Sequence, residues 1–233
     1  MADAHRRLIN SLVEENDRAS TQVGINEVKG AVENGPRLCA TGLSTGIVVA
    51  VLGIYRDPAS PDTPRNDRFL LHAGEGSLEA GMDKLQQALQ TARQAGLLEL
   101  EAHILIPEAF SFTKKRAPSP SGTETSQQGS SAANTLAVNE WDDDDLRSRL
   151  ATQKSLRERL EQLTRGGPVR WYKYPVCHDS GPYRWTHGML VSPDETVLCM
   201  SLGRSSQGEE MQARDIDPVK DGKEDEDSGL RCC

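Results

Sequence analysis

Two hydroxyl side chains lie at a small-residue turn, and a histidine follows on a later apolar stretch. The turn belongs to LCATGLSTGIVVAVLGIYRD, residues 38–57, and holds Ser44 and Thr45. His72 lies in RFLLHAG, which reads as a second strand. A hydroxyl becomes an effective nucleophile when an adjacent base removes its proton. Ser44, Thr45 and His72 are therefore candidate catalytic residues for nucleophilic attack.

The glycines of the same turn suggest a second chemistry. Gly42 and Gly46 allow a tight turn, and amide N–H groups there form a candidate anion-binding nest. The LSTG stretch lacks the lysine and the glycine spacing of a phosphate-binding loop, so nucleotide binding is not indicated. The five histidines show neither H-x-H nor HExxH spacing. The sequence therefore predicts neither a metal nor a cofactor.

Cysteine and histidine offer few alternative dyads. Cys39 precedes the turn, and a free cysteine on an apolar strand is most often a core residue. Cys177 and His178 are adjacent in sequence, but neighbouring strand residues point to opposite faces. His178 and His187 are further candidates to approach His72 in space, and His103 is expected to be structural. An odd cysteine count without a CxxC pair favours a reducing compartment, either the cytoplasm or the nucleus.

The composition restricts the partners. The chain has 233 residues and a formal net charge of -8, which argues against nucleic acid or an anionic membrane as the main partner. The N-terminus has no apolar signal region, and IVVAVLGIY is too short to span a bilayer. Another protein is the expected partner.

Periodicity predicts a folded domain over residues 20–202, between an N-terminal helical extension at 1–19 and an acidic disordered tail at 203–233. Strands are expected around the turn, at RFLLHAG, at LLELEAHILIP and at VRWYKYPV, and YRWTHGMLVS with ETVLCMSL predicts a hairpin. Because the closing strands pair locally, we expect an α/β or α+β sandwich with a mixed sheet rather than a doubly wound one.

Two helices and an insertion complete the prediction. Residues 77–96 form the clearest helix, since Leu78, Met82, Leu85, Leu89 and Ala92 fall on one face. Ser77 is its expected N-cap and Gly96 its expected stop. The Ser/Gln-rich residues 113–140 read as a disordered insertion. A second helix at 141–165 has a thin apolar stripe and is expected on the surface; the stripe comprises Leu146, Leu150, Leu160 and Leu163.

The order of motifs resembles the CheD family of chemoreceptor glutamine deamidases and, more distantly, the catalytic domain of cytotoxic necrotizing factor. Val23-Gly24-Ile25-Asn26-Glu27 is similar to the opening strand of that family, and ATGLSTGIVVAVLGIYRDP to its nucleophile turn, apolar strand and D-P. RFLLHAG, QTARQAGLLELEAHI and DSGPYRWTHGMLVSPDETVLCM follow in the family's order. The resemblance covers Val23 to Leu202 and implies a CheD-like deamidase fold.

The resemblance also implies a chemistry, and this chain departs from it. In the family a cysteine thiolate attacks the side-chain amide of a glutamine in a protein, and a histidine assists. His72 matches that histidine, but the cysteine falls on Gly46. The family's upstream threonine falls on Ala40, or on Thr41 if one residue is skipped.

The last two residues suggest a modification. The chain ends in GLRCC, and paired terminal cysteines resemble doubly geranylgeranylated ends, so Cys232 and Cys233 are candidate lipidation sites. The acidic tract before them opposes contact with anionic lipid. A membrane is expected as a partner only if these cysteines are lipidated.

Three functions follow from these features. The first is a degenerate, non-catalytic deamidase-fold protein that binds, serving as an accessory member of a eukaryotic pathway, for example a fungal specialised-metabolic one. The second is an active amidohydrolase of the protein-glutamine deamidase type that uses His72 with Thr45, Ser44 or a displaced cysteine. The third is an interaction protein that docks through the helix at 141–165. The missing sulfur favours the first.

Overall fold

The computed structural model describes residues 20–43, 45–56, 65–74, 76–107, 143–175, 183–205 and 211–219. These residues form a mixed α+β fold with two five-stranded sheets and two helices. The outer sheet has the order β1-β3-β8-β9-β10, and the central sheet has the order β2-β5-β4-β6-β7. The elements are β1 (Ser20–Gln22), β2 (Glu27–Val32), β3 (Arg37–Leu43), β4 (Ile47–Tyr55), β5 (Asn66–Ala73), α2 (Leu78–Gln94), β6 (Leu97–Pro107), α3 (Asp143–Thr164), β7 (Val169–Tyr174), β8 (Tyr183–Val191), β9 (Val197–Ser205) and β10 (Met211–Asp215).

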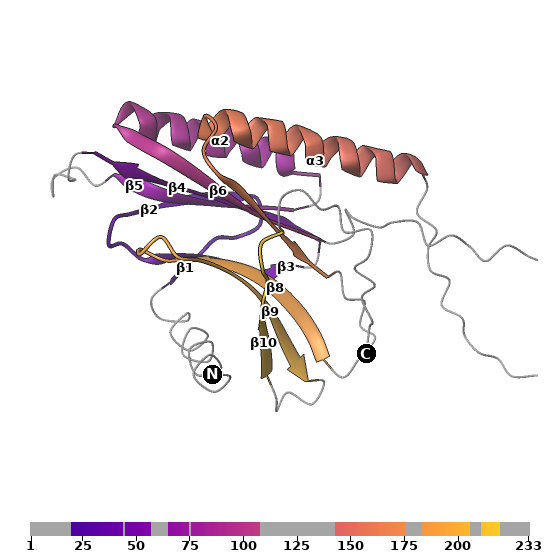
Figure 1. The fold of residues 1–233 in the computed structure, drawn as a ribbon. Coiled ribbons are helices and arrows are strands. Elements are labelled where there is room, and N and C mark those ends of the chain that lie inside the picture. The colour runs from indigo at the N-terminus through magenta and orange to yellow at the C-terminus, as the bar shows by residue number, and fades with distance from the viewer. Residues whose placement is uncertain are drawn as a thin grey trace, which may run out of the picture.

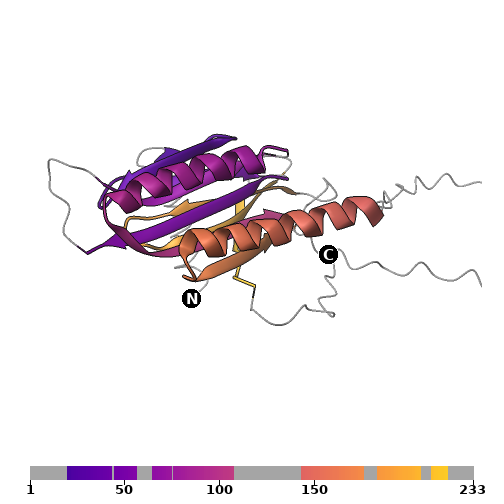
Figure 2. The same cartoon turned by 90° about the horizontal axis from the view of Figure 1, so that it is seen from above.

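The fold has three layers. Both helices cover one face of the central sheet, and the outer sheet covers the other face (Figure 1). Figure 2 shows α2 and α3 side by side over the central sheet. The pairs β1–β3 and β6–β7 are parallel, whereas the remaining pairs are antiparallel. This arrangement agrees with the predicted mixed sandwich.

Strand β4 shows why the core divides into two layers. Val49 and Val51 pack beneath the helices, while Val48 and Ala50 pack between the two sheets. Successive strand residues point to opposite faces, so a strand covered on both sides must be apolar throughout. The uninterrupted apolar run predicted such a strand, and the prediction is confirmed.

Helix α2 follows its predicted face. Met82, Leu85, Leu89 and Ala92 are buried against the central sheet, and the chain leaves the helix through Gly96 at φ +99°. Ser77 occupies the N-cap position but makes no capping hydrogen bond. Its hydroxyl donates instead to the Gly74 carbonyl at 2.8 Å and also contacts the Asn26 side chain.

Helix α3 packs into the core along one face, which corrects the prediction that this helix lies on the surface. Leu156, Leu160 and Leu163 are buried in the core layer beneath the helices. The Arg159 guanidinium binds the Glu79 carboxylate of α2 at 2.9 Å, and it also pairs with Asp83. The predicted stripe omitted Leu156, which lies on the same buried face as Leu160 and Leu163. The side chains of Leu146 and Leu150 lie outside the described residues.

We expect Leu160→Ala to lower the free energy of unfolding by about 2–5 kcal/mol, because it removes a fully buried side chain and leaves a cavity. Urea unfolding measures this loss. Lys154→Ala, an exposed change on the same helix, is the matched control and should alter stability by less than about 0.5 kcal/mol. Equal effects of the two changes would show that α3 is not part of the core.

The ordered chain extends past residue 202, which corrects the predicted tail. Strand β9 continues to Ser205, and β10 pairs with it antiparallel. The Val219 amide then donates to the Trp171 carbonyl at 2.7 Å beside the edge strand β7. The predicted extension at 1–19 and the insertion at 113–140 lie outside the described residues. Among the helices described, none has the length and apolarity of a bilayer-spanning segment.

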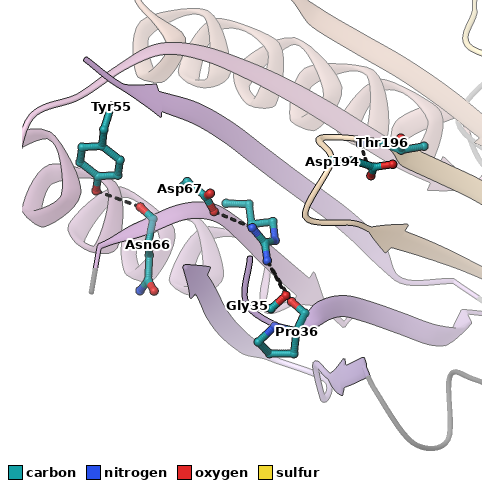
Figure 3. A network of polar contacts seen from close by, with 8 residues as sticks. Gly35, Pro36, Tyr55, Asn66, Asp67, Asp194 and Thr196 are labelled. Carbon is teal, nitrogen blue, oxygen red and sulfur yellow. Dashed lines mark hydrogen bonds and ion pairs between the residues drawn. The ribbon is translucent and has the colours of Figure 1, made fainter. Parts of the chain in front are cut away.

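A buried arginine ties the β2–β3 connection to the central sheet. Arg68 is 2% exposed; its Nη1 donates to Asp67 at 2.8 Å, and its Nη2 donates to the carbonyls of Gly35 and Pro36 at 3.0 and 3.2 Å. Figure 3 shows Asp67, Gly35 and Pro36 gathered around this guanidinium. Because a buried charge needs a partner, the ion pair with Asp67 and the two carbonyl contacts fix where the chain turns into the outer sheet, although Nε of Arg68 is buried without a partner.

Candidate functional site

The site forms where β4 begins and β5 ends. Val48 lies opposite His72, and Ile47 lies opposite Ala73, in the antiparallel register of these strands. Gly46 therefore lies just beyond the paired region, on the same face as His72. A Cβ atom at residue 46 would lie 3.3 Å from His72 Nε2. The chain thus brings together the two positions that the motifs had singled out.

The imidazole is oriented from its other nitrogen. His72 is 4% exposed, and its Nδ1 lies 3.4 Å from the Val23 carbonyl oxygen. A carbonyl only accepts, so this contact favours the neutral tautomer with hydrogen on Nδ1. Its Nε2 lone pair then faces residue 46. Burial lowers the pKa of His72, and the contact with Val23 opposes part of that shift, so the ring is neutral at pH 7.

Residue 46 offers the imidazole no reacting group. Glycine has no side chain, although Gly46 is not among the glycines of the described chain with positive φ. A side chain there would meet the Ala73 carbonyl oxygen at 3.1 Å and Leu43 Cδ2 at 3.2 Å from its Cβ. The backbone conformation therefore permits a side chain, and the neighbours must yield by a few tenths of an ångström to admit one.

A second group of buried polar side chains holds the Gly46 backbone. The Tyr174 hydroxyl donates to the Gly46 carbonyl at 2.7 Å, and its ring stacks on His187 at 4.6 Å between centroids. His187 Nδ1 lies 2.8 Å from Ser201 Oγ. Burial raises the pKa of Tyr174 and lowers that of His187 to about 4. At pH 7 these groups are neutral, so they position the turn without adding charge.

We expect the chain to lose stability as the pH falls from about 6.5 toward 4, because the pKa of His187 is lowered to about 4 from 6.5. The unfolded chain then binds more protons than the folded chain, so the stability present above pH 6.5 declines on acidification. At about pH 5 His187 alone should remove roughly 2 kcal/mol. The pKa values of His72 and His103 are lowered too and act in the same direction.

Urea unfolding of the wild type and of His187→Gln, at about pH 7.5 and pH 5, measures this loss. The variant lacks the titrating ring, so its stability should fall by roughly 2 kcal/mol less between the two pH values. Identical losses would assign the acid sensitivity to other groups.

The hydroxyl candidates are not joined to the base. Thr45 is exposed on the bend before Gly46, and no hydrogen bond connects it to His72 within the described part of the chain. Ser44 lies outside the described residues. Gly42 has φ +78° where the β3–β8 register shifts between Ala40 and Leu43, so its conformational freedom serves a β-bulge.

The cysteine candidates are placed away from the imidazole. Cys39 packs with Leu190 and Met200 on the outer face of the outer sheet, whereas its neighbours Leu38 and Ala40 pack between the sheets. Cys199 is buried between the sheets, and burial raises the pKa of its thiol. Cys177, His178, Cys232 and Cys233 lie outside the described residues.

His103 fits its expected structural role. Its Nδ1 lies 3.0 Å from the Tyr172 hydroxyl, and its Nε2 lies 3.0 Å from the Glu101 carboxylate. Arg170 binds the same carboxylate at 2.8 Å. These contacts satisfy a buried ring at the junction of β6 and β7. In the part of the chain that the structure describes, no three His, Cys, Asp or Glu side chains form a metal-binding group.

Three positioning residues were missed by the sequence reasoning. Tyr174 lies on β7, far from the site in sequence, and no local pattern signals it. Val23 follows β1 and was named only as part of the V-G-I-N-E motif, without its role at His72. Asn26 is the third: its amide donates to the His72 carbonyl at 2.6 Å, and its side-chain oxygen accepts from the Gly74 amide at 3.0 Å. Its φ of +65° is a conformation that asparagine tolerates better than most residues, so the V-G-I-N-E stretch held a usable signal.

Comparison with known proteins assigns no family. Neither the scan against protein-family models nor the search of the curated proteins gives a match to this chain. The described residues form a two-sheet α+β protein in which a histidine faces a glycine at a strand-opening turn.

Proposed function

We propose that this chain is a CheD-like, degenerate glutamine-deamidase-fold protein that binds a partner protein without turning it over. The observation that carries the proposal is the distance of 3.3 Å between His72 Nε2 and a Cβ at residue 46. A thiol attached there would contact the ring nitrogen that is free to accept its proton. The site therefore keeps the base of a cysteine hydrolase while lacking the sulfur.

The support from the surrounding residues is consistent. The V-G-I-N-E stretch orients His72 through the Val23 carbonyl and the Asn26 amide. Tyr174 holds the carbonyl of the residue that replaces the nucleophile. The imidazole and the Tyr174 hydroxyl are buried and neutral, and no side-chain nucleophile in the described part of the chain accompanies them, which favours binding over covalent attack. Binding as an accessory protein is thus the function we infer.

Incubation of the wild-type chain with a glutamine-rich protein such as casein tests this proposal. We expect no ammonia release beyond the level of His72→Ala. The substrate should also not gain the mass of about 1 Da that conversion of an amide to an acid adds. Release that disappears in His72→Ala would contradict the binding-only function and favour the amidohydrolase with Thr45 or Ser44. Equal background in both chains supports the proposal.

A further inference from the structure

Within the described part of the chain, strand β2 is an edge strand, and its charge pattern is self-complementary. It ends the order of the central sheet, and its first residues are Glu27, Val28 and Lys29. Glu27 and Lys29 point to one face of the strand and form an ion pair at 3.3 Å, with both side chains exposed. Val28 points to the other face, where it packs against the core layer beneath the helices.

The surface beside β2 is hollowed. An open depression is lined by Asn26 to Lys29 on the strand side and by Lys84 and Ala88 of α2. Ile25, the more exposed of the two exposed large apolar side chains in the described chain, precedes the strand and is 65% exposed. An unpaired strand edge beside apolar surface is a template for another strand.

We propose that β2 pairs antiparallel with β2 of a second copy of this chain, about a two-fold axis through Val28. In this register Glu27 lies opposite Lys29 of the second copy, and Lys29 lies opposite its Glu27. The two Val28 side chains meet on the helix side, where the depressions of both copies adjoin. Two opposite-charge pairs and one apolar pair each contribute about 0.2–1 kcal/mol, in addition to the shared main-chain hydrogen bonds.

The charges select this register over its neighbours. With a two-fold axis normal to the sheet, residues that lie opposite each other point to the same face. One strand can therefore shift against the other only by two residues at a time, which moves the axis by one residue. An axis through residue 27 would place Glu27 opposite Glu27, and an axis through residue 29 would place Lys29 opposite Lys29. Both arrangements are destabilised by like charges. A lone edge lysine opposes association, whereas Lys29 combined with Glu27 permits one pairing and disfavours the others.

Charge reversal tests the pairing in the full chain, independently of the proposed function at Gly46. Sedimentation equilibrium over roughly 1 µM to 1 mM should show a dimer for the wild type. Glu27→Lys and Lys29→Glu should each weaken dimerisation by about tenfold or more, since each creates two like-charge pairs. The double variant Glu27→Lys/Lys29→Glu should restore it. Lys154→Glu on α3 is the matched reversal and should leave the dimer intact.

A monomer across the whole range, or a double variant that folds but stays monomeric, overturns the proposal. Because Glu27 also accepts from the Gly24 amide, a single reversal could disturb the local turn. Val28→Cys, in a chain with Cys232 and Cys233 replaced by serine, avoids that difficulty. Opposed strand residues have Cβ atoms about 4.5–5.5 Å apart, so oxidation should cross-link two copies through residue 28. Gly30→Cys, two residues from the axis, should cross-link far less, and equal cross-linking would exclude this register.

Discussion

Gly46→Cys is expected to carry a thiol that reacts with iodoacetamide at neutral pH at least about tenfold faster than the same thiol in Gly46→Cys/His72→Gln. This factor is smaller than the rate enhancement that a positioned general base usually gives. The reason is the distance of 3.3 Å between a Cβ at residue 46 and His72 Nε2. The lone pair of that nitrogen accepts the thiol proton as the sulfur attacks. Mass spectrometry of the alkylated peptide separates residue 46 from the other cysteines.

Gly46→Ala provides the steric control for this result. The alanine Cβ meets the same Ala73 oxygen and Leu43 methyl group, so it should destabilise the chain by about 1–3 kcal/mol, as overpacking does. A similar loss in Gly46→Cys then reflects the Cβ and not the sulfur. A thiol at residue 46 that reacts equally fast with and without His72 would show that the imidazole is not directed at this position.

Arg68→Ala is expected to be among the most destabilising single changes, lowering the free energy of unfolding by about 3–5 kcal/mol. It leaves the half-buried Asp67 carboxylate without its ion pair, and the carbonyls of Gly35 and Pro36 without their donor. Burial already raises the pKa of Asp67 against the lowering effect of Arg68. Losing that effect should move the pKa further up. Urea unfolding at neutral pH gives the stability loss.

The companion change tests the same argument from the other partner. In Arg68→Met/Asp67→Asn no unpaired charge remains buried, so the loss should be smaller than for Arg68→Ala despite the second substitution. Arg157→Ala, which removes a guanidinium stacked on Trp171 outside this network, serves for comparison. A loss below about 1 kcal/mol for Arg68→Ala would mean that the network does not hold the β2–β3 connection in place.

The local elements of this fold could be predicted from the sequence because each is determined by residues that are close in sequence. The buried face of α2 follows helical spacing, and the β8–β9 hairpin follows two apolar strands with a short turn, where Ser192 and Thr196 close the loop. The apolar run of β4 required cover on both faces, which the helices and the outer sheet provide.

The division of the strands between two sheets could not be predicted from the sequence, because it depends on pairing between distant segments. β1 joins the outer sheet beside β3, whereas β2, separated from β1 by four residues, joins the central sheet beside β5. No local pattern marks that crossing at Val23. β10 was likewise hidden in a polar stretch, since an edge strand needs few apolar residues.

Only part of the candidate site could be predicted from the sequence. The motif order placed His72 and Gly46 in one site, and the strand register places them side by side. The contacts that orient them were not predicted: Tyr174 is 128 residues from Gly46 along the chain, and Val23, although part of the opening motif, is 49 residues from His72. Each is a single hydrogen bond across the fold, and a single bond of this kind leaves no periodic trace in a sequence.

The most direct test of the account is ammonia release from casein by the wild type, by Gly46→Cys and by Gly46→Cys/His72→Gln, measured side by side. The account predicts no release by the wild type. It predicts release by Gly46→Cys at least about a hundredfold above background, because a positioned nucleophile and base give rate enhancements of that size. That release should be lost without His72. Ammonia release by the wild type that depends on His72 would contradict it, because it would show that the imidazole still activates a nucleophile, either water or a hydroxyl, without the missing sulfur.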